Sequence, residues 1–113
     1  MSYEAYEADY VRGVSDLDVT LEGLRMARNR LRDAQRDLAV AHGHAVRTAA
    51  KDEDLSNAEL RRSWVDEAMA THPATAALGD HEDEVREYED AASVIRAGLR
   101  GRLAGMAFET ATV

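Results

Sequence analysis

Cysteine is absent from this chain of 113 residues, and proline, tryptophan and phenylalanine each occur once. Without cysteine the fold has neither disulfides nor thiolate metal sites, and redox chemistry does not indicate the compartment. Aromatic residues are few, and no stretch alternates Val or Ile with polar residues, so the pattern of a β-strand is missing. Abundant alanine favours helix instead. These features predict an all-α protein.

Long apolar runs are also missing. The longest are too short to span a bilayer, and Glu4, Glu7 and Asp9 give the N-terminus an acidic character that is not typical of a signal peptide. We therefore expect a cytoplasmic protein that does not bind membranes. A chain this short fits one domain with little deeply buried core, so we also expect a homo-oligomer.

Residues 14–50 carry the clearest periodicity. Leucine recurs every seven residues, and an alanine follows each of the last three leucines by three positions. The leucines are Leu17, Leu24, Leu31 and Leu38. This Leu/Ala heptad predicts a long helix that presents a seam to another helix, with Ser15 or Asp16 capping its start.

A second seam, with apolar residues spaced by three and four, follows later in the chain. It consists of Val85, Tyr88, Ala92, Ile95, Leu99 and Met106. Gly79 and Asp80 predict a break and a helix cap before it. Between the two long helices, Ser56 and Glu59 predict a capping box for a short helix that ends at Thr71-His72-Pro73.

The two seams match in length and register if residue 50 lies opposite residue 80, which places Leu24 near Met106. The predicted fold is an antiparallel long-helix hairpin, coiled-coil-like, with a short third helix at the turn. The predicted segments are an acidic Tyr-containing N-terminal segment (1–13), the hairpin domain (14–107) and a C-terminal tail (108–113). The same seams would also build a dimeric bundle, and both outcomes remain open at this point.

The net charge of −8 is spread unevenly. Six arginines against two aspartates give residues 23–50 a charge of +4, whereas thirteen acidic against four basic residues give residues 51–90 a charge of −9. In the predicted register, arginines from both long helices converge at the open end of the hairpin. The candidates are Arg25, Arg28, Arg32, Arg36, Arg96, Arg100 and Arg102. Nucleic-acid binding through this end is one hypothesis, and neutralisation by nearby acids is its structural alternative.

The acidic run of residues 80–90 allows other interpretations. It is either a solvated face or a surface that imitates nucleic acid toward a basic protein. Glu87 and Asp90 fit half of the pattern of helical Mg-dependent nucleotide pyrophosphatases, but the companion E-x-x-E is missing between residues 55 and 75. His42 and His44 point to nearly opposite sides of a helix. We predict no catalytic residue, no metal and no cofactor.

Aromatic residues mark two candidate protein-binding segments. Tyr3, Tyr6 and Tyr10 share one face of a potential helix whose other positions are acidic, and Trp64 lies on the apolar face of the short helix. The tyrosine segment either docks a partner, packs within the chain or is disordered.

Taken together, the layout resembles small helical-hairpin proteins that tailed phages encode near their recombination and replication genes. The resemblance covers residues 17–105 and rests on the Ala/Leu/Arg-rich first helix, the segment 57–61 and the acidic-to-basic second helix. It implies a bacterial host cytoplasm and a setting in phage DNA metabolism, without an assigned activity. Our leading hypothesis is a non-enzymatic helical accessory module that binds another protein.

Overall fold

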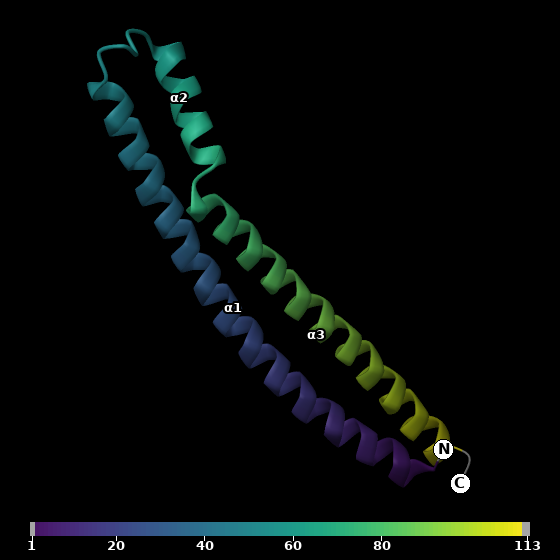
Figure 1. Ribbon diagram of the computed structural model, residues 1–113. Helices are drawn as coiled ribbons and strands as arrows, with labels where there is room; N and C mark the ends of the chain where they lie inside the picture. The colour runs from purple at the N-terminus through teal and green to yellow at the C-terminus, as the bar shows by residue number, and fades with distance from the viewer. Residues whose placement is uncertain (1, 112–113) are drawn as a thin grey trace. The chain divides into compact units, whose positions relative to one another are not determined.

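The computed structural model describes residues 2–111 and is all-α over this range, as predicted. Its three helices are α1 (Tyr3–Lys51), α2 (Ala58–Ala70) and α3 (Pro73–Ala111), which Figure 1 shows in chain order from purple to yellow. No strand occurs among the described residues.

Helix α1 begins twelve or more residues before the predicted cap. Ser2 caps it, since its hydroxyl accepts a hydrogen bond from the Ala5 amide at 3.3 Å and its carbonyl accepts one from the Tyr6 amide at 3.1 Å. The predicted start at Ser15 or Asp16 is therefore wrong. The helix passes residue 13 without a break because the residues before it continue the same helical face.

The start of α2 is also capped differently from the prediction. The N-cap is Asn57, whose side-chain oxygen accepts a hydrogen bond from the Leu60 amide at 2.9 Å. The capping box on Ser56 and Glu59 is therefore wrong by one residue. An Asn at this position satisfies the free amide of the third helical residue, as the predicted Ser would have done.

Helix α3 begins at Pro73, not at Asp80. Proline suits the first position of a helix because it lacks an amide hydrogen that would go unsatisfied there. The imidazole Nδ1 of His72 accepts a hydrogen bond from the Ala74 amide at 3.0 Å. Gly79 lies within α3, since neighbouring alanines favour helix strongly enough to outweigh a cost of about 1 kcal/mol for glycine.

The described residues divide into two compact units. The first unit joins the beginning of α1, up to Ala27, to α3 from Val85 onward. A Cβ built at Gly13 would lie 2.7 Å from Leu99 Cδ2, and one built at Gly23 would overlap the ring of Tyr88. Partners further along α1 therefore lie earlier on α3, so the two segments run antiparallel.

The second unit, Arg28–Glu84, combines the end of α1 with α2 and the start of α3. Ala45 and Ala49 of α1 form a buried cluster with Val65 of α2. Leu55, Trp64 and Met69 pack against this cluster and are partly buried. Helix α2 thus lies along α1, and small side chains on α1 make room for it.

The predicted register between the long helices is wrong. It placed Leu24 near Met106, whereas the neighbouring Gly23 faces Tyr88 in the first unit. The difference arises because α2 packs on the last turns of α1. The prediction had instead paired those turns with the second long helix.

The buried core is mostly alanine. Its members are Leu24, Ala27, Ala34, Ala45, Ala49, Val65, Val85 and Ala92. The other predicted seam residues are half-buried; they are Leu17, Leu31, Leu38, Ala41, Tyr88, Ile95, Leu99 and Met106. No large side chain in the described part of the chain is fully buried. Each unit therefore gains modest stabilisation from burial.

Candidate interaction surfaces

Within the first unit, Arg25 and Arg102 do not converge as the predicted register had placed them. In the first unit Arg102 Nε lies 3.8 Å from the carboxylate of Asp9, on the opposite helix. Because Gly23 faces Tyr88 and Arg102 lies about 14 residues further along α3, Arg25 and Arg102 are separated by about 20 Å. The register of the first unit therefore keeps these two arginines apart.

Acidic neighbours hold two of the other candidate arginines. The Arg25 guanidinium donates two hydrogen bonds to Glu22, one of them at 2.6 Å. These bonds lower the pKa of Glu22 and raise the pKa of Arg25, because each favours the charged form. Arg36 lies 3.8 Å from Asp33. Nearby acids thus pair with Arg25 and Arg36, as the alternative to nucleic-acid binding predicts.

Four candidate arginines remain exposed and form no ion pair within residues 2–111. They are Arg28 and Arg32 on α1, and Arg96 and Arg100 on α3. Each pair is spaced by four residues, so its members lie on one face of their helix. The structure thus supplies two small basic patches, one in each unit.

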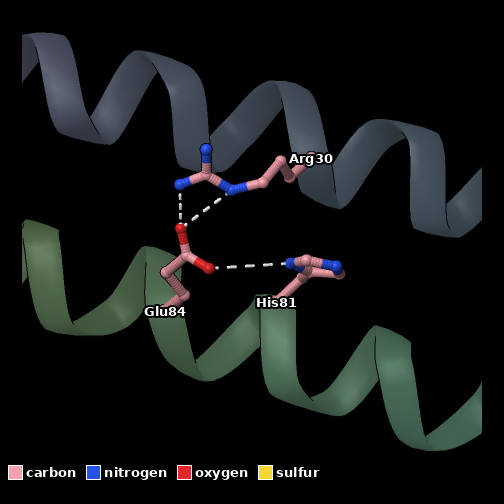
Figure 2. A network of polar contacts seen from close by, with 3 residues as sticks. All are labelled: Arg30, His81 and Glu84. Carbon is pink, nitrogen blue, oxygen red and sulfur yellow. Dashed lines mark hydrogen bonds and ion pairs between the residues drawn. The ribbon is translucent and has the colours of Figure 1, made fainter.

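A network of three charged or polar side chains lies in the second unit (Figure 2). Both Nε and Nη2 of Arg30 donate to the same oxygen of Glu84, the first at 3.0 Å. The second oxygen of Glu84 lies 3.7 Å from Nδ1 of His81, one helical turn away on α3. Glu84 therefore divides its two oxygens between α1 and its own helix.

The network changes the acidity of its carboxylate. The hydrogen bonds from Arg30 are the main cause that lowers the pKa of Glu84, and partial burial opposes them. His81 Nδ1 is buried but accepts or donates no hydrogen bond within the described part of the chain. The three side chains remain 30–42% exposed, so the network links α3 to α1 at a solvent-exposed edge of the unit.

Beside this network lies a hollow of about 340 Å³. Arg30, Asp33 and Asp37 line it from α1, and Pro73 and His81 line it from α3. No group of three or more His, Asp or Glu side chains within residues 2–111 is arranged to hold a metal ion. The hollow thus combines both signs of charge without a set of ligands for a cation.

A second hollow, of about 390 Å³, lies between α1 and α2. Val46, Ala49 and Val65 form its apolar part, and Arg61 and Arg62 stand among its polar lining. The Arg61 Nε donates to the Leu55 carbonyl at 3.1 Å, which ties α2 to the loop before it.

The aromatic protein-binding candidates face inward more than expected. Trp64 is partly buried against the Ala45 cluster, whereas the large apolar side chain of Leu60 on the same helix is 44% exposed. Tyr10 is half-buried, and a Cβ at Gly105 would overlap the ring of Tyr6. The tyrosine segment therefore packs within the chain, although Tyr3 remains 40% exposed.

The two most exposed large apolar residues on α3 were missed by the sequence analysis. Val94 is 73% exposed and Phe108 is 65% exposed. Their separation is a multiple of seven, which was a usable signal, but the alanines and glycine between them do not stand out in an alanine-rich helix. The pairing of Arg30 with Glu84 left no signal at all, because 54 residues separate them.

Comparison of the chain with protein-family models, with curated proteins and with solved structures finds no match in any of the three. None of the helices within residues 2–111 is long and apolar enough to cross a membrane.

Proposed function

We propose that this protein is a non-enzymatic helical accessory module that self-associates and acts by binding another protein. The balance of buried and exposed apolar residues carries the proposal. The largest side chains of the buried core are Leu and Val, while Val94, Phe108 and nine other large apolar side chains are exposed. Where such residues lie together, they form the kind of apolar surface that a partner covers.

The ionisable groups are consistent with a binding role. Both carboxylates with a shifted pKa, Glu22 and Glu84, are shifted downward by an arginine and stay charged at neutral pH. A general acid would need the opposite shift. Ion pairs this exposed contribute little to stability, but they leave both carboxylates engaged by an arginine.

Two measurements test the proposal. Light scattering coupled to size exclusion should give a mass that is a multiple of the 12.4 kDa chain. Pull-down from a lysate of the organism that encodes the chain should retain its protein partner after nuclease treatment. A monomer that captures no protein would overturn the proposal, and capture that disappears with nuclease would favour nucleic acid as the partner.

Direct nucleic-acid binding is the second candidate, and it now rests on the exposed patches. Spacing of four residues lets Arg28 and Arg32 contact neighbouring phosphates, and the same holds for Arg96 and Arg100. Under this reading, charge reversal at Arg28 and Arg32 should reduce binding to duplex DNA and reduce its dependence on salt. Absence of any salt-dependent binding would exclude it. An acidic DNA-mimic role and a setting in phage DNA metabolism remain predictions.

A further inference from the structure

The hollow between α1 and α2 is walled by small apolar side chains. It belongs to the second unit, in which α2 runs back along the end of α1 (Figure 1). Its apolar lining consists of Val46, Ala49, Ala50, Ala58 and Val65. Ala49 and Val65 are buried, whereas Val46 is 45% exposed. An apolar molecule in the hollow would therefore rest on packed side chains and cover Val46.

The arginines of the same lining are not engaged by carboxylates. Arg61 and Arg62 form no ion pair within residues 2–111, and the Arg61 Nε donates to the Leu55 carbonyl. Ala58, the first residue of α2, also lines the hollow, so the positive end of the helix dipole is close by. The hollow thus offers positive charge beside an apolar surface, in a chain whose net charge is −8.

The acidic residue of the lining gives this charge a direction. Asp66 lies four residues after Arg62 on α2, about 6 Å further along the helix, and the described residues show no ion pair between them. Because α2 runs back along α1, Asp66 lies toward the same end as His42, which comes from an earlier turn of α1. An anionic group is therefore attracted to the arginines and repelled from the Asp66 end.

We propose that this hollow binds a small ionised carboxylic acid with an aliphatic tail. Arg61 and Arg62 donate to the carboxylate, since a planar guanidinium matches its two oxygens. The tail lies along Val46 and Val65. The volume of about 390 Å³ is within the ~300–1,000 Å³ of sites for small molecules. The described residues that line the hollow include no aromatic ring for stacking, which favours an aliphatic tail.

Decanoate is the probe for this site. Isothermal titration calorimetry should give one decanoate bound per chain, and NMR should show contacts between its tail and the methyl groups of Val46 and Val65. Butyrate has the same carboxylate with a shorter tail, so binding should weaken by up to about fourfold for each methylene removed. Butyrate that binds as tightly as decanoate would show that charge alone attracts the acid, and would overturn the proposal.

Reversal of one charge tests the role of the arginines. For Arg62→Glu we expect the dissociation constant of decanoate to rise about tenfold or more, because a charged hydrogen bond is replaced by repulsion. Arg12→Glu makes the same change of net charge in the first unit, at a side chain that is 73% exposed, and should bind decanoate as the wild type does. Equal weakening in both variants would assign the effect to net charge and contradict the site.

Filling the hollow tests its location. Ala50 lines the hollow and is exposed, so Ala50→Phe should occupy the space of the tail and abolish decanoate binding while the helical circular dichroism stays unchanged. Ala39→Phe places the same ring at an exposed position of α1 outside the lining, and should leave binding intact.

Two outcomes overturn the inference without touching the proposed function. Either the wild type binds no decanoate, or binding persists in Ala50→Phe. The mass in solution and the capture of a protein partner are separate measurements, so the accessory role stands or falls independently of this ligand.

Discussion

The ring of Tyr88 occupies the space that a Cβ would fill at Gly23. Its Cζ would lie 2.9 Å from that atom, closer than carbon atoms pack. Leu99 stands in the same relation to Gly13, and Tyr6 to Gly105. In each case a large side chain of one helix enters a gap left by glycine on the other. These three contacts, more than the leucine repeat, set the register of the first unit.

Filling one of these gaps should destabilise the protein. We expect Gly23→Ala to have a lower free energy of unfolding than Gly79→Ala, by roughly 1–3 kcal/mol, because the added methyl displaces the Tyr88 ring. Both variants gain about 1 kcal/mol of helix propensity, so the comparison isolates the clash. Urea denaturation followed by circular dichroism measures the difference. Equal stability of the two variants would show that Tyr88 moves aside freely.

The Arg30–Glu84 pair should give the protein a specific pH dependence. Its contribution to stability is complete above the ordinary carboxyl pKa of 4.5 and is lost as pH falls through the lowered pKa of folded Glu84. We therefore expect Glu84→Gln to be less stable than the wild type at neutral pH, and the gap to narrow near pH 3. Thermal unfolding at both pH values provides the measurement.

Glu82→Gln is the control for this experiment, because Glu82 is an exposed acid on the same helix. Its stability relative to the wild type should change little between the two pH values. If both variants show the same pH dependence, the effect belongs to the general charge of the chain and not to Arg30.

Packing between α1 and α2 should be sensitive to volume at Ala45, which is 7% exposed and lies in the buried cluster with Val65. We expect Ala45→Leu to lower the free energy of unfolding by roughly 1–3 kcal/mol, since three more carbons would overpack the cluster. Ala39→Leu, at an exposed position of the same helix, should be close to neutral. Fluorescence of Trp64, the single tryptophan, reports unfolding of this unit. A neutral Ala45→Leu would contradict tight packing here.

The two possible caps of α2, Asn57 and Ser56, predict different effects of substitution on stability. Because Asn57 accepts the Leu60 amide, Asn57→Ala should cost about 1 kcal/mol of stability. Ser56→Ala should have little effect. The same fluorescence denaturation decides between them, and the reverse order of effects would restore the capping box predicted from the sequence.

The sequence by itself determined that the chain is helical and which residues form much of the seam. Leu24 and Val85 are buried where a period of seven placed them, because a helix that repeats at 3.6 residues must bury one face. The same reasoning missed the contacts at Gly13, Gly23 and Gly105. Glycine carries no apolar signal, and its role as a gap appears only when the opposing side chain is known.

Tertiary structure alone decided which residues meet. Two seams with regular spacing fit together in many registers, so the pattern did not distinguish Leu24 near Met106 from Gly23 near Tyr88. Steric fit at glycine and the packing of α2 on Ala45 and Ala49 choose one of them. That choice separates Arg25 from Arg102 in the first unit and brings Arg30 to Glu84 in the second. Local periodicity can be read from the sequence, whereas contact between distant residues depends on shape complementarity that exists only after folding.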